Sequence, residues 1–277
     1  MLENILLITD LDGTCLPSSK IISDENKQAI NYWRSLGGRF SIATGRTIQS
    51  AKRYWDELEI TDPVILYNGS AIYDPEHQKF IYTKPLPSIA KDVVIDVQKN
   101  ISDVGIEILC TDGTYVVQNN FYEKQHIEYC QVSPVYCDIY NMPDKDWLKV
   151  LFAVSPYEMS DLISFIQSKG WEDICFVQST ASYYEMSSLN ITKGSALDIY
   201  RKRFCKPEDK IISVGDYDND IELLQNADYG VAPANAQDSV KQVADYVLQN
   251  SCDNNAIAEL ISRILSEFKS MEGPKWI

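Results

Sequence analysis

The stretch ITDLDGT, residues 8–14, places two aspartates directly after an apolar run. Residues 4–9, NILLIT, are typical of a short strand that is buried on both faces. Asp10 and Asp12 follow at positions i and i+2, so their side chains can project to the same side of the chain. Gly13 then lets the backbone turn. Two like charges at a buried strand end are unfavourable, so the stretch indicates either a turn capped by aspartate or a functional site.

Alternating strands and helices around this stretch predict a parallel sheet with helices on its faces. In the first part of the chain we expect a strand at 4–9, a helix at 23–36, a strand at 39–44, a helix at 47–59 and a strand within 64–74. The last part repeats the pattern with a helix at 191–204, a strand at 210–216, a helix at 219–227, a strand at 229–233, a helix at 239–244 and a strand at 245–249. The tail, 255–268, is amphipathic.

The middle of the chain mixes helices with alternating strands instead. Helices are expected at 89–98 and 158–168, and Asp112-Gly113 marks a hairpin turn. We therefore expect a discontinuous first domain, residues 1–84 and 187–277, with a second domain inserted at 85–186. The predicted fold class is α/β, with a Rossmann-like, doubly wound parallel sheet as the core and an inserted α/β domain.

Charge and composition argue against several classes of partner. The chain has 277 residues and a formal net charge of −15, whereas nucleic acid and anionic membranes need clustered Lys and Arg. No apolar run approaches the roughly 20 residues of a membrane span, and the first one is too short for a signal peptide. The 7 scattered cysteines contain no C-x-x-C pair, which favours reduced thiols in a cytosol. We expect a cytoplasmic protein, either a monomer or a weak homo-oligomer.

Four polar segments are expected at one edge of the sheet, because ligands on open α/β sheets collect at the carboxyl ends of the strands. They are DLDGT at 10–14, ATGR at 43–46, ITKGS at 191–195 and GDYDND at 215–220. The aspartates of the last segment suit a hard cation such as Mg²⁺, although aspartate is also favoured at helix starts. Thr44 and Gly45 lie at a strand-to-helix junction where backbone N–H groups can face an anion. Lys193 begins a helix against the helix dipole, which indicates a nearby anion.

Together, these segments resemble the four motifs of the haloacid dehalogenase superfamily, in the same order. The motifs are DLDGT, SIATGR, ITKGSAL and GDYDND, and the insert between the second and third resembles the α/β cap of the Cof-like and sucrose-phosphatase-like branch. Two further stretches, ILYNGSAIYD at 65–74 and YGVAPANAQDSVKQVADYV at 229–247, support that placement.

The resemblance implies phosphoryl transfer through an aspartyl-phosphate. Asp10 would be the nucleophile, and Asp12 would protonate the leaving oxygen and then activate water. The phosphoryl oxygens would be bound by Thr44, Gly45, Lys193 and Asn219. Mg²⁺ would be held by Asp10, Asp216, Asp220 and the main-chain carbonyl of Asp12.

The function expected from the resemblance is a Mg²⁺-dependent phosphatase acting on a small phosphorylated metabolite, for example a sugar phosphate. Two alternatives stay open: a phosphomutase with the same aspartyl-phosphate, and a non-catalytic regulatory protein on the same fold. The two histidines, His77 and His126, show no triad or metal spacing. We expect both of them at surface or loop positions.

Overall fold

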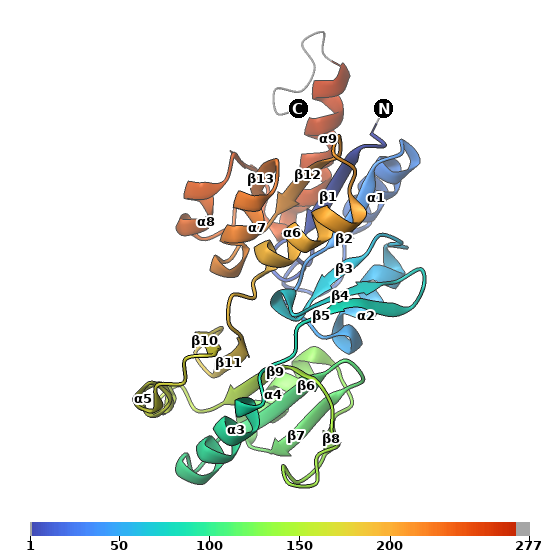
Figure 1. Cartoon of the computed structure of the whole chain (residues 1–277). Coiled ribbons are helices and arrows are strands. Elements are labelled where there is room, and N and C mark those ends of the chain that lie inside the picture. The colour runs from blue at the N-terminus through green and yellow to red at the C-terminus, as the bar shows by residue number, and fades with distance from the viewer. Residues whose placement is uncertain (1, 270–277) are drawn as a thin grey trace. The chain divides into compact units, whose positions relative to one another are not determined.

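The computed structural model describes residues 2–269, and the described chain forms two compact units (Figure 1). The first unit comprises 2–45, 52–81 and 192–269, and the second comprises 46–51 and 82–191. The main crossings between units fall at 81/82 and 191/192. The boundaries expected from the sequence are 84/85 and 186/187.

A five-stranded parallel sheet forms the centre of the first unit, in the order β14-β13-β12-β1-β2. The strands are β1 (Ile5–Thr9), β2 (Arg39–Ile42), β12 (Lys210–Val214), β13 (Tyr229–Ala232) and β14 (Tyr246–Val247). Every residue of β1 is buried, as its apolar sequence predicts. This strand pairs with β12 on one side and β2 on the other.

Helices cover both faces of this sheet. They are α1 (Asp24–Ser35), α2 (Ile48–Glu57), α6 (Lys193–Phe204), α7 (Ile221–Asn226), α8 (Asp238–Val243) and α9 (Ala256–Lys269). The pair α6 and α7 packs together, as does the pair α1 and α9, and Figure 1 shows the two pairs on opposite sides of the sheet. Ser23 caps α1 by accepting a hydrogen bond from the Asn26 N–H. The doubly wound α/β class expected from the sequence is confirmed.

The third expected strand does not join the parallel sheet. It forms β3 (Val64–Leu66), which turns back through the short helix η1 (Tyr67–Gly69) to pair with β4 (Ala71–Asp74), followed by β5 (Lys79–Thr83). A single parallel bridge, Ala43 to Ile65, links β3 to the end of β2. The turn explains the difference, because Gly69 has a φ of +104° and a Cβ there would lie 2.1 Å from the Thr192 carbonyl oxygen.

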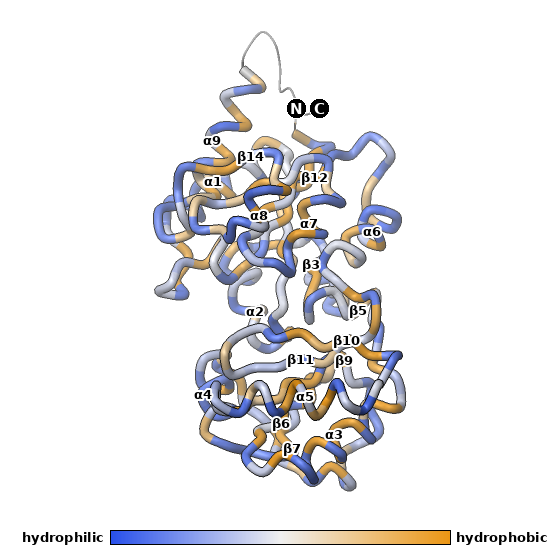
Figure 2. Tube along the Cα trace, turned by 90° about the vertical axis from the view of Figure 1, so that its left-hand side faces the viewer, coloured by the Kyte–Doolittle hydropathy of each residue, from blue (hydrophilic) through white to orange (hydrophobic). Residues whose placement is uncertain are grey.

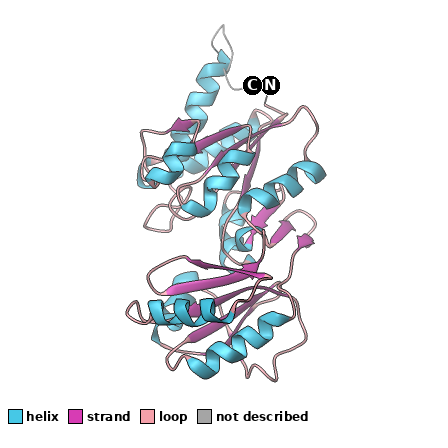
Figure 3. Ribbon diagram, turned by 60° about the vertical axis from the view of Figure 1, so that its left-hand side comes forward, coloured by secondary structure: helices cyan, strands magenta, loops and turns pink. Residues whose placement is uncertain are grey.

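The second unit has its own six-stranded sheet, in the order β10-β11-β9-β6-β7-β8, visible in magenta in Figure 3. Its strands are β6 (Gly105–Cys110), β7 (Thr114–Gln118), β8 (Val135–Tyr136), β9 (Trp147–Ala153), β10 (Ile174–Gln178) and β11 (Tyr183–Ser188). Its helices are α3 (Ile89–Asn100), α4 (Phe121–Cys130) and α5 (Met159–Lys169). All strand pairs are antiparallel except β7 with β8.

The two faces of this second sheet differ in polarity. One face packs α3 and α5 onto alternate strand residues such as Ile106, Ile108 and Val150. The intervening strand residues, Glu107 and Lys149 among them, project to the other face, where α4 contacts β6 and β9. Figure 2 shows orange and blue alternating along α5, as expected for a helix with one buried face.

Helix α4 is absent from the sequence-based expectation, because its apolar residues do not follow a clear helical period and its buried residue is Glu123. This helix also holds His126, whose Nδ1 lies 2.8 Å from Oε1 of Glu107. The expectation of a surface or loop position is therefore wrong for His126. It is confirmed for His77, which is exposed in the turn after β4.

Two expectations about the whole chain were tested on the described residues. None of the 7 cysteines, all of which lie in the described chain, is in a disulfide. Within residues 2–269, no helix combines the length and apolar character that a membrane crossing requires.

Candidate active site

The carboxyl ends of three neighbouring strands bring the predicted residues together. Thr9, the last residue of β1, lies opposite Ile42 of β2 and Val214 of β12. The next residue, Asp10, donates its N–H to the Val214 carbonyl over 2.8 Å. The segments that follow these strands therefore begin side by side, although they are about 30 and 200 residues apart in sequence.

Lys193 occupies the centre of this cluster. It is the first residue of α6 and its side chain is only 2% exposed. Its Nζ lies 2.7 Å from Oδ1 of Asp10 and 2.6 Å from Oδ1 of Asp220. The helix start is fixed by a capping box between Thr192 and Ser195, so the lysine leaves the backbone in a defined direction. One ammonium group thus contacts two of the predicted carboxylates.

Asp216 lies on the other side of the carboxylate cluster. Its Oδ1 accepts a hydrogen bond of 2.6 Å from the Thr14 hydroxyl, which joins the segment after β12 to the segment after β1. Gly13 permits this approach, because it has a φ of +80° and a Cβ there would lie 2.4 Å from Oδ2 of Asp216. Asp10, Asp216 and Asp220 each offer an oxygen atom, and these atoms lie within 4.8 Å of one another.

Asp220 is more strongly engaged by the chain itself than the other two carboxylates. It is fully buried, and its Oδ1 accepts from Lys193. Its Oδ2 accepts the backbone N–H groups of Asp216 over 3.0 Å and of Tyr217 over 3.1 Å. Both oxygen atoms therefore already have protein donors. This arrangement suits a residue that holds Lys193 and the 215–217 turn in place.

The cluster carries more negative charge than its single lysine can balance. Burial raises the pKa of Asp10 well above its ordinary range; Lys193 opposes this shift, while Asp220 and Asp216 add to it. Burial also raises the pKa of Asp216 to about 6, with the Thr14 hydroxyl opposing and Asp220 adding to the shift. Buried carboxylate oxygens with excess negative charge are the donor set that a hard divalent cation requires. The residues present therefore fit Mg²⁺.

Without a divalent cation, the protein is expected to lose stability as the pH rises from about 5 to about 7. The pKa of Asp216 in the folded protein is about 6, above its ordinary 3.8, and that of Asp10 shifts in the same direction. The folded state then binds more protons than the unfolded state in this window, so the unfolding free energy falls by about 1–3 kcal/mol as the pH rises. Urea denaturation in EDTA at both pH values measures the loss.

Mg²⁺ should reverse this loss, because its positive charge takes the place of the protons that the carboxylates lose as the pH rises. Its stabilising effect should be larger at pH 7 than at pH 5, and Asp216→Asn should reduce that difference. An equal effect of Mg²⁺ at both pH values, in the natural chain and in the variant, would contradict a cation site at this cluster.

Asp12 differs from Asp10 in its surroundings. Its Oδ1 lies 2.6 Å from Nζ of Lys20, and both side chains are partly exposed. Asp10, by contrast, is buried at 5% exposure and contacts Lys193. The two aspartates of the opening motif thus belong to separate ion pairs, which lessens their mutual repulsion, although the charge of Asp12 still contributes to the raised pKa of Asp10.

Three of the four predicted phosphate-binding residues, all but Lys193, are linked by Asn68, which the sequence analysis did not single out. Thr44 is buried, and its carbonyl accepts the Asn68 N–H over 3.1 Å. Asn68 in turn accepts a hydrogen bond of 3.2 Å from the Asn219 side chain. Gly45 lies against the same residue, since a Cβ there would be 2.6 Å from Oδ1 of Asn68. The available sequence signal was the Asn-Gly pair in ILYNGSAIYD, which is typical of a tight turn. In the structure this asparagine adopts a φ of +54°.

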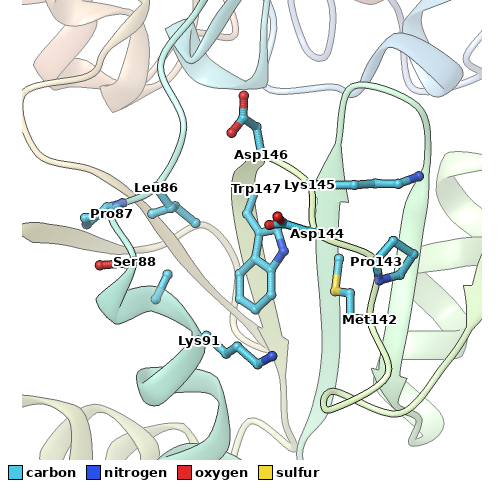
Figure 4. Close-up of a pocket in the computed structure, with 11 residues that line it drawn as sticks. Leu86, Pro87, Ser88, Lys91, Met142, Pro143, Asp144, Lys145, Asp146 and Trp147 are labelled. Atoms are coloured by element: carbon cyan, nitrogen blue, oxygen red, sulfur yellow. The ribbon is translucent and has the colours of Figure 1, made fainter.

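The second unit contains a separate cavity of about 370 Å³, which none of the predicted site residues line. Figure 4 shows the Trp147 indole at its centre, with Lys91 on one side and Met142 on the other. Its two lysines are matched by two aspartates, and Lys145 also pairs with Asp112. This cavity therefore lacks the excess positive charge that a phosphate group requires.

Comparison with known proteins establishes the class. The family model of haloacid dehalogenase-like hydrolases matches residues 7–261, and the chain belongs to this family. Two curated relatives from Bacillus subtilis (strain 168) are 5-amino-6-(5-phospho-D-ribitylamino)uracil phosphatases. YitU is 25% identical over 274 residues, covering 96% of this chain and 98% of the relative. YcsE is 26% identical over 249 residues, covering 90% and 91%.

Solved structures agree with this assignment at the level of the fold. A haloacid dehalogenase-like hydrolase from Bacteroides thetaiotaomicron superposes with a TM-score of 0.85 at 24% identity, covering 94% of this chain and 98% of that one. The resemblance stated from the four motifs is confirmed, and so is the prediction of an enzyme of the phosphatase class.

Proposed function

We propose that the chain is a Mg²⁺-dependent phosphatase that hydrolyses a small phosphorylated metabolite through an aspartyl-phosphate on Asp10. The observation that carries the proposal is the position of Asp10. It is buried at the carboxyl end of the central strand, bonded to Lys193 and within 4.8 Å of other carboxylate oxygens. A buried carboxylate oriented by a lysine is suited to attack phosphorus, because its direction is fixed before the substrate binds.

In the first step a carboxylate oxygen of Asp10 attacks phosphorus, and the bond from phosphorus to the leaving oxygen breaks. Lys193 contacts Oδ1 of Asp10, so it restricts rotation of the carboxylate about the Cβ–Cγ bond of Asp10. Asp12 acts as the general acid, so on substrate binding its carboxyl must exchange the ion pair with Lys20 for a proton, which it then gives to the leaving oxygen. In the second step Asp12 takes a proton from water, the water oxygen attacks phosphorus, and the bond from phosphorus to Asp10 breaks, so that phosphate leaves.

The phosphoryl oxygens would contact Lys193, the segment at Thr44 and Gly45 after β2, and Asn219 after β12. Attack by a carboxylate on a phosphate dianion meets repulsion of about 4 kcal/mol per charge pair at roughly 4 Å and an effective dielectric near 20. Mg²⁺ would be held by Asp10, Asp216 and the main-chain carbonyl of Asp12, and when bound it supplies positive charge that offsets this repulsion. We assign Asp220 the role of holding Lys193, because both of its oxygens already accept protein hydrogen bonds.

The two curated relatives support a substrate class. Both are named as phosphatases of a ribitylamino-uracil phosphate, in which the phosphate sits on a sugar alcohol. We propose a phosphorylated metabolite of comparable size with a hydroxylated chain or ring. The inserted domain, predicted at 85–186, would select the leaving group. We further propose a cytoplasmic monomer or weak homo-oligomer that does not bind nucleic acid or membranes, in keeping with the net charge of −15.

The test is phosphate release from an aryl phosphate and from a panel of sugar and sugar-alcohol phosphates, with Mg²⁺ or with EDTA. We expect release that requires Mg²⁺ and returns when Mg²⁺ is added back. Conversion of one sugar phosphate to its isomer without release of phosphate would instead indicate a phosphomutase. No turnover of any compound with Mg²⁺, in folded protein, would contradict the proposal.

A further inference from the structure

The second unit contains three side chains in series that the proposed phosphatase chemistry does not use. Helix α4 places His126 and Cys130 one turn apart, on the same side of the helix. Glu107 lies on β6, in the interior of the sheet beneath them. The distance from Sγ of Cys130 to Nε2 of His126 is 3.5 Å, and His126 Nδ1 lies 2.8 and 2.9 Å from the two oxygens of Glu107. The Cys130 thiol, the His126 imidazole and the Glu107 carboxylate are hereafter called the α4 relay.

The imidazole of the α4 relay is fixed in orientation and in charge. Glu107 is fully buried and faces Nδ1, and the Tyr183 ring packs edge-on against the imidazole at 5.0 Å between centroids. Burial lowers the pKa of His126, but the charge of Glu107 and the hydrogen bonds outweigh burial and raise it to about 10. His126 is therefore a cation at neutral pH. Its Nε2–H then donates toward the sulfur of Cys130.

The other six thiols have different surroundings. Burial raises the pKa of each, to about 12 for Cys15 and Cys110, which keeps them as neutral thiols. Cys205 also has a cationic neighbour, the Arg39 guanidinium at 3.9 Å, but that group is shared with Asp62 and Asp209. Reactivity of a cysteine follows its thiolate character and its access to solvent. Cys130 is half-buried and alone among the seven faces an imidazole.

A second observation is an acidic group on the same helix whose charge interacts with Glu107 and His126 of the α4 relay. Glu123, one turn before His126 on the same helix, is fully buried, and neither of its carboxyl oxygens has a partner among the described residues. Burial and the charge of Glu107 raise its pKa to about 7, against the opposing charges of Lys124 and His126. A buried carboxyl without hydrogen-bond partners is unfavourable, and protonation or water from outside the chain reduces the cost.

We propose that Cys130 is a reactive thiol, modified by hydroperoxides and other small electrophiles, with His126 and Glu107 as positioning residues. The sulfur of Cys130, once deprotonated, attacks the terminal oxygen of the hydroperoxide, so an S–O bond forms and the O–O bond breaks. The departing oxygen takes a proton from His126 Nε2 and leaves as water or an alcohol. The sulfur is oxidised by two electrons to a sulfenic acid, and the peroxide is reduced. This site is independent of the proposed phosphatase function.

The test uses the full-length, folded protein and follows each cysteine separately. The reduced protein is exposed to limiting iodoacetamide at pH 7, and peptide mass spectrometry gives the alkylation rate of each thiol. Cys137 is the matched control, because it is half-buried in the same unit and its charged neighbour is the carboxylate of Asp138 instead of an imidazole. We expect Cys130 to be alkylated about tenfold faster than Cys137 and Cys205. Hydrogen peroxide followed by dimedone should label Cys130 first.

Two variants separate a positioned thiol from one that is merely accessible. His126→Gln and Glu107→Gln should each lower the Cys130 rate about tenfold while leaving the Cys137 rate unchanged. Glu128→Gln, at an exposed position of the same helix, should change neither rate. Equal rates for Cys130 and Cys137 in the natural chain would overturn the proposal, and so would an unchanged Cys130 rate in both variants. If circular dichroism shows that a variant does not fold, the ratio of the Cys130 rate to the Cys137 rate in the natural chain decides between the two outcomes.

Discussion

Asp10→Asn is expected to lower kcat/KM for phosphate-ester hydrolysis by at least about a thousandfold, because the amide is a far poorer nucleophile than the carboxylate. The substitution preserves the shape of the side chain and an oxygen that can still accept from Lys193, which lies 2.7 Å away. The loss should therefore appear without loss of folding. Initial rates with an aryl phosphate, together with mass spectrometry of acid-quenched enzyme for a covalent phosphate, measure it.

The same variant should be more stable than the natural chain when Mg²⁺ is absent. It removes one carboxylate from a cluster of three whose lysine contacts only two of them, so the unfolding free energy at pH 7 should rise by about 1–2 kcal/mol. Asp173→Asn, at an exposed position, is the control and should change neither activity nor stability. Turnover in Asp10→Asn equal to that of the natural chain would remove Asp10 from the mechanism.

The location of the candidate site could be predicted from sequence because three of its four segments follow an apolar run, while the fourth begins a helix. The ends of parallel strands meet at one sheet edge, so short motifs after 4–9, 39–44 and 210–216 had to converge once those runs were neighbours. The structure makes them neighbours by pairing β1 with both β2 and β12. A strand can be recognised from the local sequence, and the predicted convergence of the three motifs depended mainly on recognising these strands.

The division of roles within the cluster could not be predicted in the same way. That Asp220 gives one oxygen to Lys193 and the other to two backbone N–H groups depends on side-chain geometry across 27 residues of chain. Asn68 is a similar case, since its contacts with the segments around Thr44 and Asn219 exist only after β3 turns back on itself. Long-range contacts of this kind leave no period or spacing in a single sequence.

The α4 relay could be predicted in part: two of its residues show a helical spacing in the sequence, but the third does not. A histidine and a cysteine at i and i+4 were visible in the sequence, and they would share one face of any helix at 121–130. The helix itself was missed, because its buried residue is the charged Glu123 where an apolar residue is expected. Glu107, 19 residues upstream of His126, joins them only through the fold.

Lys193→Met should have the largest effect on stability, about 3–5 kcal/mol of unfolding free energy at pH 7 in EDTA, because it leaves buried carboxylates without their cation. Burial lowers the pKa of Lys193, but Asp10 and Asp220 outweigh burial and raise it, so the lysine is charged in the folded protein. Activity should fall at least about a hundredfold as well, since the same ammonium orients the nucleophile. Urea denaturation and initial rates measure the two losses. Lys52→Met is the matched control, because Lys52 pairs with Asp56 at the surface and should contribute less than about 1 kcal/mol.

Acidification and a second substitution identify the cause of this destabilisation. Asp10 and Asp216 have raised pKa values, so at pH 5 the folded variant can protonate them and the deficit of Lys193→Met should shrink. Adding Asp220→Asn removes a charge that the lysine had balanced, so the double variant should recover about 1–3 kcal/mol relative to Lys193→Met. If the double variant is less stable than the single one, and the deficit is the same at both pH values, the lysine acts through packing. In that case the charge balance would not explain why a lysine, rather than an apolar side chain of similar length, begins α6.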